Sequence, residues 1–237
     1  NSHAYHEAGL LLSILARVSR VMECDRYILT IAMLDGEPNA QHILADLLEE
    51  QGDLGVARWA RARKRHIVPR LELAIGMLPH RAALSLACDF AEHVIQPMAT
   101  RWWAPNITEG FQPLRLWLLG SATDDELIAA CLILDSDSQY PDPYDRSAPE
   151  QNVCRALAGA AQNARLAAKH AATQSPKTHH FDRECATDAR KTARHAREAR
   201  PRKTATAGRA NRRNETQWQI ARTRNLLVSL TEGLIAS

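Results

Sequence analysis

The sequence predicts an all-α protein: an array of antiparallel helices with a basic, partly exposed helical arm towards the C-terminus. Of the 237 residues, 45% are hydrophobic but only 5% aromatic, and Ala and Leu supply much of the apolar content. Both residues favour helix, and Gly and Pro are modest at 10 and 11 residues. Apolar side chains also recur at spacings of three and four residues in several segments, which is the period of an amphipathic helix.

The first elements lie before residue 67. Residues 3–34 hold two short apolar segments, and we expect the first of them to pack against the body of the protein. A turn at 35–38 precedes a helix that ends at Gly52, where a C-terminal glycine is expected. Asp53 can cap the next helix, whose basic end suits the negative pole of its dipole.

Residues 26–64 combine an apolar helix, a Pro/Asp turn and an A-D-x-L-E-E-x-G-D core. The core consists of Ala45, Asp46, Leu48, Glu49, Glu50, Gly52 and Asp53. This segment resembles the short repeat-companion segment found in many large bacterial families. The resemblance implies no chemistry, and a plain helix–turn–helix hairpin with an acidic edge is the alternative interpretation.

The segment 80–103, after a short helix that follows Pro69, carries the clearest amphipathic pattern. Its apolar stripe consists of Leu84, Ala87, Cys88, Ala91, Val94, Ile95 and Met98. A helix of this kind is not stable alone in water, so we expect neighbouring helices to cover the stripe. Pro97 should kink or weaken its last turn.

Two further helices and a loop follow this segment. A short apolar helix ends at Gly120, and Thr123 with Glu126 predicts a capping box at the start of the next helix. A polar loop with three prolines occupies residues 135–150. The Ala-rich helix that comes next has small side chains, which allow close packing against its neighbours.

Residues 175–214 lose almost all of their apolar side chains and carry repeated Arg, Lys and His. We interpret this stretch as a solvated basic arm or linker. The last segment, 215–237, restores an apolar stripe and should dock back on the body. The predicted organisation is therefore an N-terminal helical segment at 1–68, a central Ala-rich domain at 69–174, the arm and the docking helix.

A helix of the form R-x-A-L-x-L-A-C-x-x-A-E begins at Arg81, and a short Trp helix and a capped Ala-rich helix follow it. The residues that carry this pattern are Arg81, Ala87, Cys88, Ala91, Glu92, Trp117, Gly120, Glu126 and Leu127. Near the C-terminus, Glu215, Trp218, Gln219 and Arg222 form a closing E-x-x-W-Q helix. The whole is similar to immunity proteins of bacterial polymorphic-toxin systems. That resemblance implies a non-enzymatic protein that binds a partner toxin and occludes it.

The sequence contains no nucleophile elbow, zinc-protease, Walker or dinucleotide-binding motif. We therefore predict no enzyme and no cofactor, although an enzyme whose site is assembled from scattered residues is the alternative. Asp89, Glu92 and His93 beside Cys88 are the one cluster of metal-ligand residue types. A metal site needs three or four convergent ligands and Cys88 lies on the apolar side, so we predict no metal there. The three polar residues are instead candidates for partner binding.

The net charge of +3 hides an asymmetry. Residues 1–159 contain 14 Lys and Arg against 21 Asp and Glu, whereas residues 160–214 contain 14 against 4. The basic stretch 183–213 can bind nucleic acid through phosphates, bind an acidic protein, or merely keep the chain soluble. It lacks the interleaved aromatic residues that stack on bases. The candidate partner-binding residues of this stretch are Arg190, Arg194, Arg197 and Arg200.

The five cysteines are widely spaced, and no two of them have the two-residue spacing of a zinc or redox motif. This pattern favours a reduced, cytoplasmic protein. No run approaches the roughly 20 apolar residues of a membrane span, and the first residues lack the pattern of a signal peptide. We therefore expect a protein partner, with a toxin as the first candidate and nucleic acid as the second, and no membrane.

Overall fold

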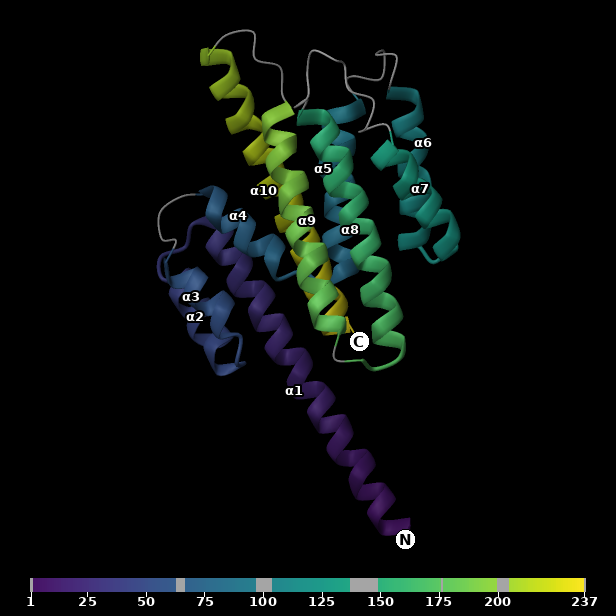
Figure 1. Ribbon diagram of the computed structural model, residues 1–237. Helices are drawn as coiled ribbons and strands as arrows, with labels where there is room; N and C mark the ends of the chain where they lie inside the picture. Colours follow the sequence, from purple (N-terminus) through teal and green to yellow (C-terminus); the bar gives the residue numbers. More distant parts are fainter. Residues whose placement is uncertain are drawn as a thin grey trace. The chain divides into compact units, whose positions relative to one another are not determined.

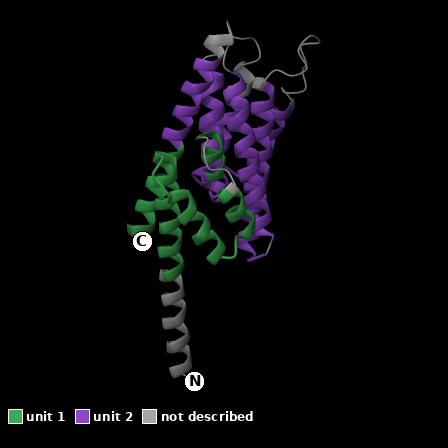
Figure 2. Ribbon diagram, turned by 90° about the vertical axis from the view of Figure 1, so that its left-hand side faces the viewer, with its two compact units in different colours: residues 1–73, 223–237 green, residues 74–222 purple. Residues whose placement is uncertain are grey.

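The computed structural model describes residues 2–62, 67–96, 104–136, 149–175, 177–199 and 205–236. Within these ranges every regular element is an α-helix, and ten helices follow one another along the chain (Figure 1). The prediction of an all-α protein is confirmed. The chain divides into two compact units, which Figure 2 shows in separate colours: residues 1–73 with 223–237 form unit 1, and residues 74–222 form unit 2.

These units follow a different division from the four predicted segments. Unit 1 joins the beginning of the chain to its last residues, 223–237, whereas the stretch 175–214 belongs to unit 2. The long C-terminal helix α10 (Ala205–Ala236) contributes its first part to unit 2 and its last part to unit 1. The apolar stripe at 215–237 predicted that this segment returns to the body of the protein, but not that its last residues belong with the first helices, because that pairing depends on tertiary packing.

Unit 1 is built from α1 (Ser2–Asp35), α2 (Ala40–Glu50), α3 (Leu54–Ala62), most of α4 (Ile67–Gly76) and the end of α10. The two apolar segments expected at 3–34 form one continuous helix of 34 residues. No proline interrupts this stretch, so one run of hydrogen bonds includes both segments. The core of the unit includes Tyr27, Met33, Leu44, Leu48, Leu71 and Leu227.

The predicted turn after α2 is confirmed at Gly52. Its φ of 79° lies in the left-handed region, which glycine adopts without steric cost. The Gly52 amide donates to the Glu49 carbonyl at 2.9 Å and the Asp53 amide donates to the Leu48 carbonyl at 2.8 Å. This is the Schellman arrangement that satisfies the last carbonyls of a helix. Arg61 of α3 then pairs with Asp46 of α2 at 2.6 Å, at an exposed position that adds little stability.

Unit 2 consists of α5 (His80–Ile95), α6 (Ala104–Leu118), α7 (Asp124–Ser136), α8 (Pro149–Ala172), α9 (Thr178–Ala199) and the first part of α10. The helix α9 packs against both α8 and α5, and the three lie side by side (Figure 1). The stripe predicted on α5 is buried from Leu84 to Ile95, and Met98 lies outside the described residues. The α-helix ends at Ile95, and Gln96, the residue before Pro97, keeps a right-handed helical conformation and donates its amide hydrogen to the Glu92 carbonyl.

The boundaries of α6 and α7 agree with the predicted end and cap. Gly120 follows α6 with a φ of 76°. The Thr123 amide donates to Glu126 Oε2 at 2.7 Å and the Glu126 amide donates to Thr123 Oγ1 at 3.3 Å, so the capping box is present. The hydrogen bond from the Thr123 amide is the main reason that the pKa of Glu126 is lowered. The helix α6 begins at Ala104, before the apolar segment for which the sequence predicted a helix, and Pro113 lies within it.

The helix α9 differs most from the sequence prediction, because it is a core helix of unit 2 on one face. Its buried residues are Cys185, Ala186, Asp188, Ala189, Thr192, Ala193, Ala196, Arg197 and Ala199. The expectation of thin burial was wrong for this face. Alanine offers little apolar surface, but it allows the helix backbones to approach closely, and a Cβ added at Gly159 of α8 would lie 2.7 Å from Asp188 Oδ2. The opposite face of α9 is exposed, as the predicted arm required.

Candidate partner-binding site

The three polar residues predicted on α5 all contact neighbouring helices, and Asp89 and Glu92 share one partner, Arg115 of α6. Arg115 Nε donates to Glu92 Oε1 at 3.0 Å and Nη2 donates to Glu92 Oε2 at 2.9 Å, so the pair is bidentate. The same Nη2 donates to Asp89 Oδ1 at 2.6 Å. Nη1 donates to the Ser85 carbonyl at 3.3 Å. One guanidinium therefore joins two carboxylates and a backbone carbonyl of α5 to α6.

This contact is partly shielded from solvent. The Asp89 side chain is 11% exposed and the Arg115 side chain 30% exposed. Burial by itself lowers the pKa of Arg115, but its hydrogen bonds to Glu92 and Asp89 outweigh burial and raise that pKa above its usual value. The guanidinium is therefore a permanent cation that compensates the two carboxylates.

Arg222 of α10 reaches the same carboxylate from a second side. Its Nε donates to Asp89 Oδ2 at 2.6 Å, while Arg115 holds the other oxygen. Asp89 thus connects three helices, α5, α6 and α10. The two arginines balance the charges of Asp89 and Glu92.

His93 of α5 meets α10 one turn further along. Its ring stacks on the indole of Trp218, with centroids 3.7 Å apart and planes at 9°. Its Nε2 lies 3.4 Å from Glu215 Oε2, and the Glu215 side chain is fully buried. Phe90 approaches the same indole edge-on, with centroids 6.1 Å apart. The ring of Trp218 is therefore held by α5 on two sides.

Gln219 extends the network to α9. Its Nε2 donates to the Ala193 carbonyl at 3.0 Å and to Glu215 Oε1 at 3.1 Å. Arg197 Nη1 donates to Gln219 Oε1 at 2.8 Å. Both partners are buried, so these bonds satisfy polar groups that would otherwise destabilise the interior.

We call these contacts of α5 and α10 with each other and with α6 and α9 the polar clamp of unit 2. Its members are Asp89, Glu92, His93, Arg115, Arg197, Glu215, Trp218, Gln219 and Arg222. Of the seven predicted site residues, four belong to it, three from α5 and Arg197 from α9. Arg197 was expected on an exposed arm, but it is buried and bonded to Gln219.

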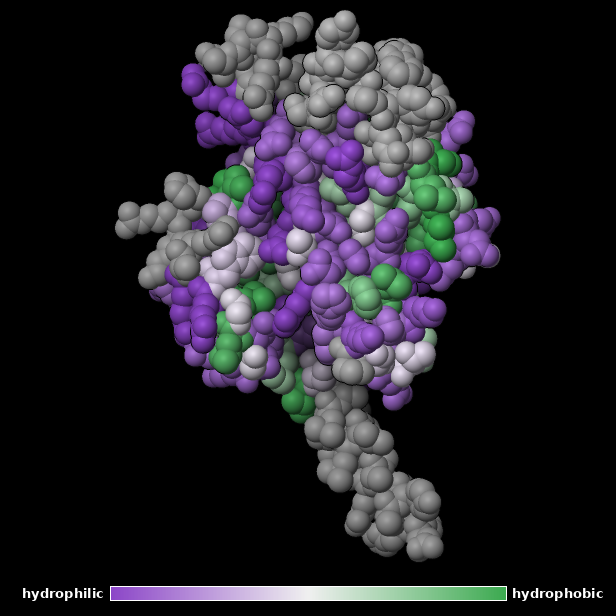
Figure 3. Space-filling view, in the orientation of Figure 1, coloured by the Kyte–Doolittle hydropathy of each residue, from purple (hydrophilic) through white to green (hydrophobic). Residues whose placement is uncertain are grey.

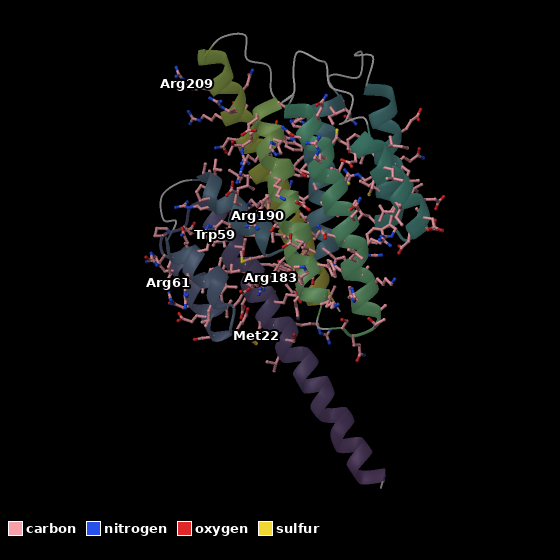
Figure 4. The ribbon with its side chains drawn as sticks, viewed as in Figure 1. Met22, Trp59, Arg61, Arg183, Arg190 and Arg209 are labelled. Carbon is pink, nitrogen blue, oxygen red and sulfur yellow. The ribbon has the colours of Figure 1, made fainter. Side chains whose placement is uncertain are left out.

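The other predicted arginines lie elsewhere. Arg194 is exposed on α9, and Arg190 Nη2 donates to Thr187 Oγ1 at 2.7 Å on the same helix. Figure 4 shows Arg183 and Arg190 along α9 and Arg209 near the start of α10. The surface over this part of unit 2 is mainly hydrophilic (Figure 3). Arg200 lies outside the described residues.

The chemistry of the polar clamp is that of structural ion pairing. Its carboxylates meet guanidinium groups or an amide, and Cys88 is buried on the apolar side of α5. Burial raises the pKa of the Cys88 thiol to about 12, which leaves almost no thiolate near neutral pH. Within the described ranges, no three His, Cys, Asp or Glu side chains converge as metal ligands would.

Sequence reasoning missed Arg115 as the partner of Asp89 and Glu92. A signal for the α10 partners was present, because Glu215, Trp218, Gln219 and Arg222 are spaced to share one helical face. In the sequence, this spacing was interpreted only as part of the resemblance to immunity proteins. Arg115 carried no comparable signal, since its contact with α5 spans 23 residues or more of sequence.

Comparison with known proteins adds no family or relative. No family model, curated protein or solved structure matches the chain. In the part of the chain that the structure describes, no helix is long and apolar enough to cross a membrane.

Proposed function

We propose that the protein is a non-enzymatic helical binding protein, an immunity protein that neutralises a partner toxin by covering it. The observation that supports this proposal is the polar clamp. Asp89 and Glu92, the acidic side chains that first suggested a site, are neutralised by Arg115 and Arg222 of the same unit. Groups paired in this way stabilise a scaffold and are poorly suited to move protons.

The partner surface we propose is the exposed face of α9 with the beginning of α10. Arg194, Arg209 and Arg213 are exposed there. Residues 160–214 carry 14 Lys and Arg against 4 Asp and Glu, so the complementary partner is acidic. Rim charges of this kind mainly raise the rate of association and select the partner.

Co-expression with the toxin genes that flank its own gene tests this function. We expect the wild-type protein to relieve the growth arrest that one such toxin causes. The double variant Arg194→Glu/Arg213→Glu should relieve it less, because the charge complementarity is reversed. Arg58→Glu/Arg155→Glu, at two exposed positions outside residues 160–214, is the matched control and should behave as the wild type. Growth arrest that persists with the wild-type protein, for every flanking toxin, would contradict the proposal.

A nucleic-acid-associated protein is the second candidate, and the net charge of +10 over residues 160–214 favours it. Binding of a fluorescent DNA duplex and of an RNA hairpin should then weaken steeply with salt, by roughly tenfold or more between 50 and 200 mM. The same affinity at both salt concentrations, or no binding at 50 mM, would rule this candidate out.

We also propose a cytoplasmic location. All five cysteines are free, and four of them are buried. Free buried thiols are typical of a reducing compartment.

A further inference from the structure

The contact between α5 and α10 contains a titratable group, His93, in a place where its charge matters. We propose that protonation of His93 tightens the first part of α10 on α5, so that this contact strengthens as the pH falls through the ordinary range of histidine. The inference rests on the geometry of the polar clamp and does not depend on the proposed function.

Glu215 of α10 is buried beside His93. Its side chain is fully buried, and a buried carboxylate is unfavourable unless cations or hydrogen-bond donors surround it. Gln219 donates one hydrogen bond to Oε1, at 3.1 Å. Oε2 lies 3.4 Å from His93 Nε2, so a protonated ring places both a donor and a positive charge beside this oxygen.

The ring of His93 also stacks on Trp218. The rings are nearly parallel and 3.7 Å apart, which is within the range of a cation–π contact. A neutral imidazole also stacks, but the electron-rich indole face attracts the imidazolium more strongly. Protonation therefore improves two contacts between α5 and α10 at once.

The surrounding charges allow this effect. On α5 the neighbouring carboxylates are Asp89 and Glu92, which Arg115 of α6 neutralises together with Arg222 of α10. On α9 the buried cation is Arg197, whose Nη1 donates to Gln219 Oε1. The arginines stay charged throughout the range of histidine, so His93 changes the balance of the polar clamp as the pH changes.

The sign of the effect follows from this arrangement. Folding favours the protonated ring, so the added stability is present on the acidic side and is lost as the pH rises. Loss of the proton leaves Glu215 with fewer favourable partners and weakens the attachment of residues 215–222.

The test uses the full chain in NMR and hydrogen exchange. We expect His93 to keep its proton to a higher pH than a histidine in an unstructured peptide. At pH 5.5, amides of residues 215–222 should exchange about tenfold more slowly in the wild type than in His93→Gln. At pH 8 the difference should be clearly smaller, because only the stacking of the neutral ring on Trp218 is then lost in His93→Gln.

His179→Gln is the matched control and should leave exchange in residues 215–222 unchanged at both pH values. A wild-type titration in which His93 loses its proton at the same pH as a histidine in an unstructured peptide would overturn the proposal, and this result needs no folded variant. An equal difference between the wild type and His93→Gln at pH 5.5 and pH 8 would overturn it as well.

Discussion

Arg115 bonds to two carboxylates and a backbone carbonyl in the polar clamp. These partners are Asp89, Glu92 and the Ser85 carbonyl, so Arg115 holds α6 to α5 through several directed contacts. Its planar guanidinium matches the two oxygens of Glu92, and a lysine at this position would supply a point charge without the fork. The residue therefore contributes both charge and geometry.

Replacement of Arg115 should destabilise unit 2. We expect Arg115→Ala to lower the free energy of unfolding by about 2 kcal/mol, because Asp89 and Glu92 keep their partial burial but lose a partner. Arg115→Lys should recover only part of this loss. Urea unfolding followed by circular dichroism measures both effects.

Arg155→Ala on α8 is the control for this series. Arg155 is exposed and lies 3.9 Å from Asp135, so its loss should change stability by less than about 0.5 kcal/mol. If Arg155→Ala and Arg115→Ala lowered the free energy of unfolding equally, Arg115 would contribute no more to stability than an exposed ion pair, which would contradict its role in the polar clamp.

The cysteines offer a second test on single residues. Burial raises the pKa of Cys88 and of Cys131 to about 12, and it raises that of Cys185 as well. Cys154 is also buried, whereas Cys24 is half-buried. At pH 8 a thiol reagent should therefore react first with Cys24, and with the other four only after denaturant is added. Rapid labelling of the folded Cys24→Ser variant would show that the buried thiols are accessible.

Among the elements, α9 shows how small residues replace large apolar ones in a core. Its buried face is mainly alanine, and its neighbour α8 carries Gly159 directly beside the Asp188 side chain of α9. Asp188 fills the space beside that glycine. Its carboxylate accepts from Asn163 at 3.0 Å and from Lys191 at 2.7 Å. The helices can lie this close only because no Cβ stands between them.

Gly159 provides a test of this packing. In an ordinary helix, Gly→Ala stabilises by roughly 0.5–1 kcal/mol. Gly159→Ala should instead destabilise the protein, since the new Cβ would lie 2.7 Å from Asp188 Oδ2. Gly233→Ala on α10 is the matched substitution, because nothing lies within 4 Å of its added Cβ. Thermal unfolding should shift downwards for the first variant and not for the second, and a shift upwards for both would contradict the close contact of α8 with α9.

For the whole molecule, local signals in the sequence predicted local structure well. Glycine at positions 52 and 120 and the pair Thr123–Glu126 marked helix ends, because caps depend on a few neighbouring residues. The apolar stripe of α5 predicted the core of unit 2. The basic composition of α9 concealed its buried face, because alanine counts weakly in hydropathy. The burial of Arg197 on this face depends on a partner on another helix, Gln219 of α10.

The division of the chain and the partners of the polar clamp required the structure. Residues 223–237 form one compact unit with residues 1–73, and no local sequence pattern predicts this pairing. The same holds for Arg222 and Asp89, which bond at 2.6 Å although 133 residues separate them in sequence. The candidate residues Asp89, Glu92 and His93 could be found by their types and spacing, but not their engagement by Arg115 and α10.

The most direct test of the account is hydrogen exchange along α9 in the full chain at neutral pH. We expect amides between Cys185 and Ala196 to exchange as slowly as those of α5, on the order of a thousandfold more slowly than in an unstructured peptide. That result would establish the basic stretch as part of the core of unit 2. Exchange at the rate of an unstructured peptide would show that the stretch is a solvated arm and would contradict the polar clamp as described.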